Sequence, residues 1–260
     1  MLGTGWTEAV ALAAAFGIAL LATPAGISGA VLLLPFQVSV LGTPSPAVTP
    51  TNLLYNVIAT PGALYRYWRQ GQTGGRTTLL LISGTLPGVV AGSVIRVELL
   101  PGPDVFELVV AAVLLPLGGW LAVASPVPQR RLPQLPEYAL VLLSAVVGCI
   151  GGIYGIGGGS ILAPILIGSG RQPSEAAPAA LGSTFVTSVA GVVTFTILSL
   201  RHSGPISPDW PTGAALGVGG LAGGYAGARL QSRLPDALIR RLVGVLVVAI
   251  AVRYVWAAAG

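Results

Sequence analysis

The chain has 260 residues, of which 53% are hydrophobic and 8% are charged, and its mean hydropathy is +0.84. Soluble domains carry about 25% charged residues, so this chain has too little charge to cover the surface of a soluble globular protein. The formal net charge of +5 comes from thirteen basic residues, all of them arginines. They lie mainly at the ends of hydrophobic segments, where arginine sets membrane orientation, and they form no soluble basic face that would bind nucleic acid.

Hydrophobic segments follow one another along the whole chain with short connections. They lack the apolar–polar alternation of barrel strands, so the sequence predicts an all-α, polytopic transmembrane helical bundle. The predicted segments cover about 6–22, 26–42, 46–66, 77–97 and 104–124 in the first half, and about 136–153, 156–169, 174–199, 209–229 and 236–258 in the second. The second segment of each half is short and rich in glycine at its start.

The two halves of the chain are similar to each other. Gly26–Pro35 matches Gly155–Pro164 at an offset of 129, with glycine, isoleucine, leucine and proline in register. The sequence between the halves is polar and rich in proline, as linkers often are. We therefore expect a first transmembrane repeat over 1–124, a linker over 125–135 and a second repeat over 136–260.

Arginine positions discriminate between two topologies. If the short second segments cross the membrane, each half has five crossings, and ten arginines face one side while Arg96, Arg201 and Arg253 face the other. If those segments are re-entrant, the division is seven against six. The positive-inside rule favours the first arrangement, which places the linker over 125–135 in the cytoplasm and both termini outside the inner (cytoplasmic) membrane. An odd number of crossings per repeat makes the two halves inverted, with broken or short helices at the centre.

Short segments interrupted by glycine or proline, at matching places in two inverted halves, are the best indication of a transport site that a sequence offers. Pro24–Pro35 and Gly151–Pro164 are such segments. A helix that begins there directs its free amide groups, which carry about half a positive charge, towards a bound anion. Close packing of small residues between helices is the alternative explanation. The predicted amide donors are Ser28, Gly29, Gly157, Gly158 and Gly159.

The following segment of each half supplies polar side chains. Asn52 and Asn56 are the only asparagines in the chain, and Thr60 follows one helical turn later on the same face. Asparagine is costly in hydrocarbon unless it meets a partner or a polar cavity, whereas hydroxyl groups can also bond to their own helix. Gln37 either lines the path or reaches the membrane interface. The predicted side-chain ligands are Asn52, Asn56, Ser183, Thr184 and Ser188.

The chain carries no motif of a hydrolase, a zinc protease or a phosphate-binding loop, and we predict neither an enzyme nor a bound cofactor or metal. The acidic residues lie at predicted segment ends and loops, with Glu107 and Glu175 nearest to the spans, so we expect no carboxylate proton relay. Cys149 is the only cysteine, which excludes an intramolecular disulfide. It is either a small packing residue or a sulfur relay, and His202 is expected in a loop.

The motif Gly155–Pro164 (GIGGGSILAP), followed by Ala179–Thr184 (AALGST), resembles the sulfite exporter TauE/SafE family, also called the toluene sulfonate uptake permeases. The resemblance covers essentially the whole chain. It implies secondary transport of a sulfur-containing anion such as sulfite, thiosulfate, sulfoacetate or another organosulfonate. In the first half, Pro24–Gly29 replaces a fuller glycine run and Thr49–Asn52 stands where a Gly-Thr-Ser-like turn is usual, which indicates an asymmetric cavity.

These observations predict a secondary transporter that binds a small anion between inverted halves and works by alternating access. A neutral polar site releases its ligand more readily than a charged one, which suits carriage. Two alternatives stay open: an anion or small-solute channel, and a membrane enzyme or assembly factor with Cys149 as its candidate nucleophile. The expected partners are the small anion and the lipid bilayer, and a homodimer is open beside a monomer.

Overall fold

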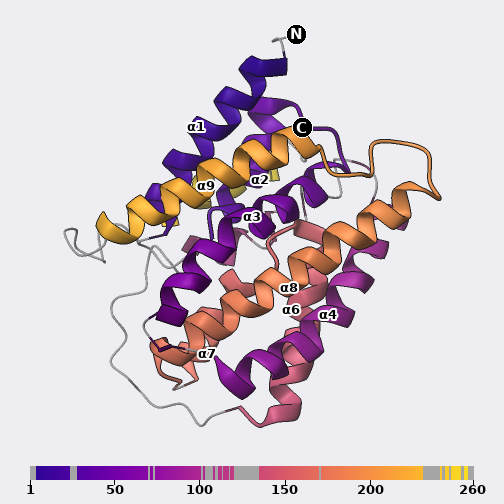
Figure 1. Cartoon of the computed structure of the whole chain (residues 1–260). Coiled ribbons are helices and arrows are strands. Elements are labelled where there is room, and N and C mark those ends of the chain that lie inside the picture. Colours follow the sequence, from indigo (N-terminus) through magenta and orange to yellow (C-terminus); the bar gives the residue numbers. More distant parts are fainter. Residues whose placement is uncertain are drawn as a thin grey trace.

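The structure, a computed structural model, consists of helices throughout the part that it describes (Figure 1). No strand occurs among the described residues, so the predicted all-α class is confirmed for them. The predicted segments 104–124 and 236–258 fall largely outside these residues. The described residues are 4–23, 28–69, 71–72, 74–100, 102, 135–169, 171–230 and short pieces within 108–119 and 241–256.

The described helices agree with the predicted segments to within a few residues. Four of them, α1, α4, α6 and α8, are long and apolar enough to cross a membrane. The short glycine-rich segments form α2, which continues into the π-helical turn η1, and α7. The bounds are α1 Thr4–Ala22, α2 Ala30–Phe36, η1 Gln37–Leu41, α3 Val48–Arg69, α4 Gly75–Glu98, α6 Glu137–Tyr154, α7 Gly159–Gly168, α8 Pro173–Ser199 and α9 Trp210–Leu230.

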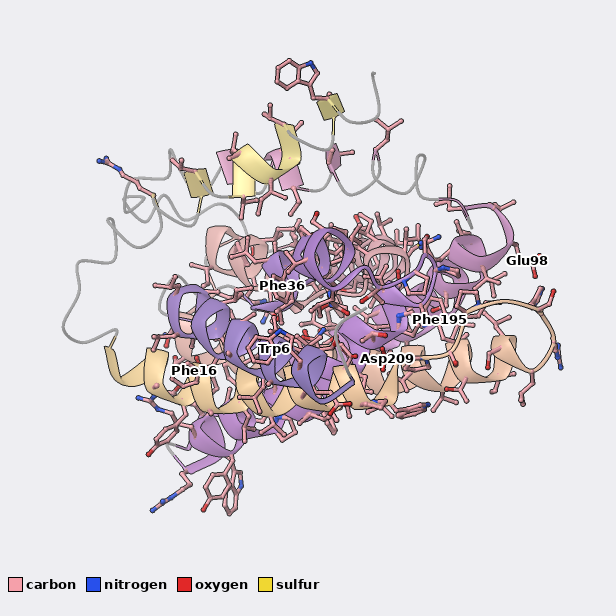
Figure 2. All side chains as sticks on the ribbon, turned by 90° about the horizontal axis from the view of Figure 1, so that it is seen from above. Trp6, Phe16, Phe36, Glu98, Phe195 and Asp209 are labelled. Atoms are coloured by element: carbon pink, nitrogen blue, oxygen red, sulfur yellow. The ribbon has the colours of Figure 1, made fainter. Side chains whose placement is uncertain are left out.

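The outer surface of the bundle carries many large apolar side chains. Trp6 and Phe16 on α1 are exposed, as is Leu142 on α6, whereas Phe195 on α8 is fully buried between helices (Figure 2). An exposed apolar surface of this extent suits lipid, because bilayer tails solvate it without the cost that water imposes. The chain is therefore a multi-pass membrane protein.

Helices of the first half pack mainly against helices of the second. The most extensive contacts join α4 to α6 and α1 to α9, and further contacts join α4 to α8, α3 to α9 and α3 to α8. When the two predicted repeats are exchanged, the α1–α9 contact becomes the α6–α4 contact, and α3–α9 becomes α8–α4. The pattern of contacts is therefore the same from either half.

Glycines at every fourth position allow two of these helix pairs to approach closely. On α4, a Cβ atom at Gly88 would collide with the Ala145 carbonyl and lie 2.9 Å from the Cys149 amide nitrogen of α6. On α9, Gly219 and Gly223 meet the backbone of α1 in the same way. Small residues at this spacing let helix backbones touch, which is the usual basis of helix association in membranes.

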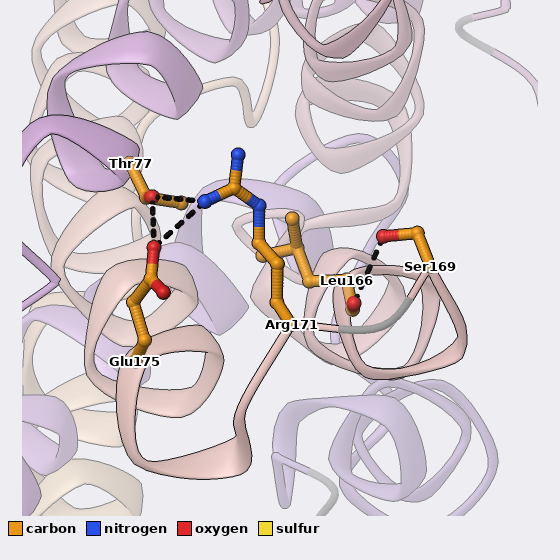
Figure 3. A network of polar contacts seen from close by, with 5 residues as sticks. All are labelled: Thr77, Leu166, Ser169, Arg171 and Glu175. Carbon is orange, nitrogen blue, oxygen red and sulfur yellow. Dashed lines mark hydrogen bonds and ion pairs between the residues drawn. The ribbon is translucent and has the colours of Figure 1, made fainter. Parts of the chain in front are cut away.

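One end of the bundle is defined by the start of α4, and we call it the Arg76 end. Arg76 Nη2 lies 2.8 Å from Glu137 Oε2 at the start of α6. The next residue, Thr77, accepts a 2.8 Å hydrogen bond from Arg171 Nη1 and donates one of 2.5 Å to Glu175 Oε1 at the start of α8 (Figure 3). The starts of α4, α6 and α8 and the residues after α7 therefore lie together.

The opposite end contains the last turn of α4, and we call it the Arg96 end. Arg96 Nε donates a 3.4 Å hydrogen bond to Thr49 Oγ1 at the start of α3. Two residues further along α3, Thr51 Oγ1 accepts a 2.9 Å hydrogen bond from the backbone amide of Asp209, directly before α9. The starts of α3 and α9 therefore lie at the Arg96 end.

The directions of several helices follow from the contacts at the two ends of the bundle. The contacts at the two ends show that α3 and α9 begin at the Arg96 end, whereas α8 and α4 begin at the Arg76 end. Helix α1 runs parallel to α9, since Gly219 packs against Leu12 and Gly227 against Leu20, and α6 runs parallel to α4. From the centre, α2 leads towards the Arg96 end and α7 towards the Arg76 end.

We expect Gly88→Ala to lower the melting temperature of the purified protein, because the new methyl group would push the backbone of α6 away from α4. Overpacking of this kind typically costs about 1–3 kcal/mol. Gly17→Ala is the matched control, since a Cβ atom there meets nothing within 4 Å and alanine favours a helix interior over glycine. Equal melting temperatures for the two variants would contradict the close α4–α6 packing.

Candidate functional site

The break between α6 and α7 is built from glycines in the left-handed region of backbone conformation. Helix α6 ends at Tyr154, and Gly155, Gly157 and Gly158 have φ angles of +85°, +66° and +82° before α7 begins at Gly159. Residues with a Cβ atom rarely adopt these angles. The glycine run of the sequence therefore produces a sharp turn inside the bundle rather than a continuous helix.

The two predicted helix breaks meet at the centre of the molecule. The backbone amide of Ser28 donates a 3.3 Å hydrogen bond to Ser160 Oγ, although these residues are 132 positions apart. Ser28 Oγ donates a 3.2 Å bond to Asn56 Oδ1, and Asn56 Nδ2 donates a 3.3 Å bond to the Gly155 carbonyl. Asn56 on α3 therefore holds the start of α2 beside the break in the second half.

Asn52, one turn before Asn56, fastens α2 to α3. Its Nδ2 donates a 2.9 Å hydrogen bond to the Ala30 carbonyl, and its Oδ1 accepts a 3.2 Å bond from Gln37 Nε2. Gln37 is fully buried, so it does not reach the membrane interface. Its Oε1 has no hydrogen-bond partner. The side chains of Asn52 and Asn56 thus bond to the protein itself in this structure.

Two further side chains satisfy carbonyl groups near the breaks. Pro35 has no N–H to offer the carbonyl of Val31 four residues earlier, and Tyr154 Oη donates a 2.8 Å hydrogen bond to that carbonyl instead. Thr49 Oγ1 donates a 3.0 Å bond to the carbonyl of Ile153 near the end of α6. Both bonds join the first half of the chain to the second.

The hydroxyl groups predicted as ligands on α8 differ in their partners. Thr184 Oγ1 donates a 2.9 Å hydrogen bond to the Ala180 carbonyl of its own helix, and Ser183 Oγ lies 2.9 Å from Thr85 Oγ1 on α4. Ser188 Oγ is fully buried and has no hydrogen-bond partner. A buried hydroxyl group without a partner is uncommon in proteins and suggests a site for a ligand.

The glycine turn lies directly against this part of α8. A Cβ atom at Gly157 would lie 2.7 Å from Ser188 Oγ, and one at Gly159 would collide with Thr184 Oγ1. In the described structure, the backbone amides of residues 157–160 donate no hydrogen bond to another described residue. The turn is thus closely packed, as the small-residue alternative requires, and it also carries free amide donors.

Tyr55, Tyr154 and Ser160 lie at the centre of the structure but were not predicted as site residues from the sequence. Tyr55 packs against the predicted Gly29, and its Oη would lie 2.5 Å from a Cβ atom at Gly29. Ser160 and Tyr154 flank the glycine run, so their position in the motif was the available signal. Nothing in the sequence indicated that Tyr154 would reach the carbonyl of Val31 in the other half.

Cys149 lies in the interface between α6 and α4, where its backbone meets Gly88 and Gly92, and its side chain is half-buried. This position agrees with the packing role considered above. No cluster of histidine, cysteine, aspartate or glutamate that could hold a metal occurs among the residues that the structure covers. Glu107, which the sequence places near a span, falls outside these residues.

Helices α2 and α7 begin side by side at the centre of a bundle of apolar helices. This arrangement defines a multi-pass membrane protein of the transporter class. The chain belongs to the sulfite exporter TauE/SafE family, whose sequence profile matches residues 11–254, and the resemblance drawn from the glycine motif is confirmed. It is 26% identical over 250 residues to a probable membrane transporter protein of Xylella fastidiosa strain 9a5c, covering 89% of this chain and 88% of that protein.

The corresponding protein of Xylella fastidiosa strain Temecula1, also described as a probable membrane transporter protein, is 26% identical over 243 residues, with coverage of 89% and 88%. No solved structure matches the chain significantly. The family and these relatives support membrane transport as the activity of this chain.

We expect Asn56→Leu to destabilise the protein even without any ligand, because it removes the side-chain donor to the Gly155 carbonyl and the acceptor of the Ser28 hydroxyl. Such a loss costs about 1–3 kcal/mol for each buried group. Thr194→Val is the control, since the hydroxyl of Thr194 bonds only to the Ala190 carbonyl of its own helix. Thermal unfolding of both variants in detergent checks this, and an unchanged melting temperature for Asn56→Leu would contradict the contact.

Proposed function

We propose that this protein is a secondary transporter that carries a small sulfur-containing anion across the cytoplasmic membrane by alternating access. Sulfite, thiosulfate, sulfoacetate and other organosulfonates are the candidate substrates, in keeping with the family. The binding site is the start of α7, where the amides of Gly157–Gly159 and the hydroxyl group of Ser188 contact the anion. Ser28, Gly29, Asn52, Asn56, Ser183 and Thr184 position these groups.

The observation that carries this proposal is the buried, unpartnered hydroxyl group of Ser188 beside the Gly157 turn. The turn opens α7, so its amides lie at the positive end of a helix dipole. N–H groups at the start of a helix, together with a neighbouring O–H group, can donate hydrogen bonds to an oxyanion. Two features that are each costly in an apolar interior, free amides and a free hydroxyl, here occur side by side.

The groups nearest to this turn are uncharged. Hydroxyl, carbonyl and aliphatic atoms of Thr184, Ser188, Ala180 and Val147 surround Gly157–Gly159 in the described structure. An anion held only by neutral donors remains free to leave, which a transporter requires. A sulfonate or sulfite group also presents several oxygen atoms in a compact shape, so it can accept hydrogen bonds from neighbouring amides at once.

Alternating access follows from the arrangement of the two halves, which we propose to be inverted repeats. Matching helices run in opposite directions, and the contacts Ser28–Ser160 and Asn56–Gly155 join the halves at the centre. Because Gly157 and Gly159 press against α8 here, the anion can enter only when α7 moves away from Ser188. Rocking of one half against the other would provide that movement and expose the site to one side at a time.

Charge distribution supports an orientation with the Arg76 end in the cytoplasm. Arg66 and Arg69 in the last turn of α3, together with Arg76 and Arg171, lie at this end. Such an excess of arginine marks the cytoplasmic side of a membrane protein. Helix α1 begins at the opposite end, so the N-terminus would lie outside.

To test the function, uptake of ³⁵S-labelled sulfite and thiosulfate into proteoliposomes can be compared between the wild type and Ser188→Ala. We expect the variant to raise the KM about ten- to a hundredfold, since one hydrogen bond to a charged group contributes roughly 1.5–3 kcal/mol. Its melting temperature without anion should be equal or higher, because an unsatisfied buried hydroxyl is removed.

Ser199→Ala is the matched control on the same helix, because the hydroxyl of Ser199 bonds to the Thr196 carbonyl of its own helix. Transport by this variant should equal that of the wild type. Equal KM values for Ser188→Ala and the wild type would contradict the assigned site. A channel instead of a carrier would be indicated if the uptake rate did not saturate with substrate concentration and labelled substrate inside did not exchange for unlabelled substrate outside.

The proposed orientation predicts opposite labelling of two exposed positions. On a Cys149→Ala background, Arg201→Cys should react with a membrane-impermeant maleimide in intact spheroplasts, because the loop after α8 would face outwards. Arg76→Cys should react only after the membrane is permeabilised. Labelling of Arg76→Cys in intact spheroplasts would show that the orientation is reversed.

A further inference from the structure

Arg96 is the only charged side chain that is buried among the residues described by the structure. It lies in the last turn of α4 and has no exposed surface. From the sequence, Arg96 was grouped with the arginines at segment ends that set membrane orientation. The other arginines whose side chains the structure describes are at least partly exposed, whereas Arg96 is not. Placing a guanidinium group inside a membrane protein is costly, so an arginine kept there commonly serves the transport pathway.

Among the described residues, the guanidinium group contacts oxygen atoms of Thr49, Ser45 and Leu100. Its Nε donates a 3.4 Å hydrogen bond to Thr49 Oγ1, its Nη2 donates to Ser45 Oγ, and its Nη1 donates to the Leu100 carbonyl. The hydroxyl groups of Ser45 and Thr49 can turn and donate to an anion. A planar fork of N–H groups flanked by two hydroxyls matches the oxygen atoms of a sulfonate, sulfite or carboxylate group.

Arg96 is linked to the proposed binding site through one residue. Thr49 Oγ1 accepts the bond from Arg96 and donates its own hydrogen, at 3.0 Å, to the carbonyl of Ile153. Two residues later, Gly155 packs on Thr49, whose carbonyl oxygen would lie 2.7 Å from a Cβ atom there. Anything that displaces the Arg96–Thr49 contact therefore acts directly on the break between α6 and α7.

The nearest acidic residue along α4 faces another partner. Glu98 Oε1 lies 2.9 Å from His202 Nε2, in the loop after α8. This contact also places Arg201, which is exposed, at the same end of the bundle as Arg96. The Arg96 end therefore offers one buried and one exposed arginine for comparison.

We infer that Arg96, with the hydroxyl groups of Ser45 and Thr49, forms an anion-recruiting site at the Arg96 end of the transport path. An oxyanion that enters from that side replaces Ser45 and Thr49 as the hydrogen-bond acceptor of Arg96. It then passes to the amides at the start of α7. This inference rests on the proposed transport of an anion. It adds a charged, selective step ahead of the neutral central site and favours oxyanions over monatomic anions such as chloride.

The test is ³⁵S-sulfite uptake by proteoliposomes carrying Arg96→Gln, Arg96→Lys or Arg201→Gln. We expect Arg96→Gln to raise the KM at least tenfold, and Arg96→Lys, which keeps the charge but loses the fork, to raise it about threefold. Maximal rates should stay within about twofold of the wild type. Arg201→Gln removes the same charge from the exposed position and should leave the KM within about twofold.

A purely structural role for Arg96 predicts a different result. In that case both Arg96 variants would lower the melting temperature and the maximal rate while the KM for sulfite stayed unchanged, and the inference would be wrong. If Arg96→Gln does not fold, Arg96→Lys and Ser45→Ala decide the question, because wild-type KM values for both would overturn it.

The same experiment separates this inference from the proposed function. A wild-type protein without saturable uptake of sulfite, thiosulfate or an alkanesulfonate would contradict anion transport itself. Uptake that is weakened by Ser188→Ala but has an unchanged KM in both Arg96 variants would leave the transport function standing and refute only the role of Arg96.

Discussion

A helix that breaks inside a bilayer leaves carbonyl and amide groups that lipid cannot satisfy, and this constraint governs the centre of the molecule. Four side chains donate hydrogen bonds to carbonyl groups near the breaks. They are Asn52 to Ala30, Thr49 to Ile153, Asn56 to Gly155 and Tyr154 to Val31. All except the first of these bonds connect the two halves of the chain. The breaks are therefore stabilised by contacts between the two halves of the chain.

The two copies of the glycine motif use this solution differently. In the first half, each of Asn52 and Asn56 has a side-chain amide that both donates and accepts hydrogen bonds. Both amides bond to other protein groups around α2 and the Gly155 turn. In the second half, the corresponding stretch of α8 carries hydroxyl groups, and Ser188 keeps its capacity unused beside the amides of the Gly157 turn. The polar side chains of α3 thus fasten the centre, whereas Ser188 on α8 and the amides of the Gly157 turn retain free donors.

Charge is distributed in a way that complements this neutral centre. The ion pairs Arg76–Glu137 and Arg171–Glu175 lie at the Arg76 end of the bundle, whereas the Glu98–His202 contact and the buried Arg96 lie at the opposite end. In the proposed transport of an anion, the charged groups at the ends would attract it from water, where their hydration is partly retained. The uncharged hydrogen-bond donors at the centre would then hold it briefly without trapping it.

The sequence by itself determined the helical class, the approximate helix positions and the places where two helices break. Hydrophobic length, glycine runs and prolines are local properties, and their effect on the backbone does not depend on distant residues. The family could likewise be inferred from the motif Gly155–Pro164, which lies within one segment of the chain.

Only the tertiary structure decided which polar groups are already used and which remain free. Asn52 and Asn56 looked like ligands from their spacing, but their partners come from the start of α2 and from Gly155, 99 residues away from Asn56. Arg96 looked like an interfacial arginine because its burial depends on Ser45, Thr49 and Leu100, which the fold brings to it. A hydrogen bond is satisfied by whatever lies within about 3 Å, and that neighbourhood is set by how the helices pack rather than by their order in the chain.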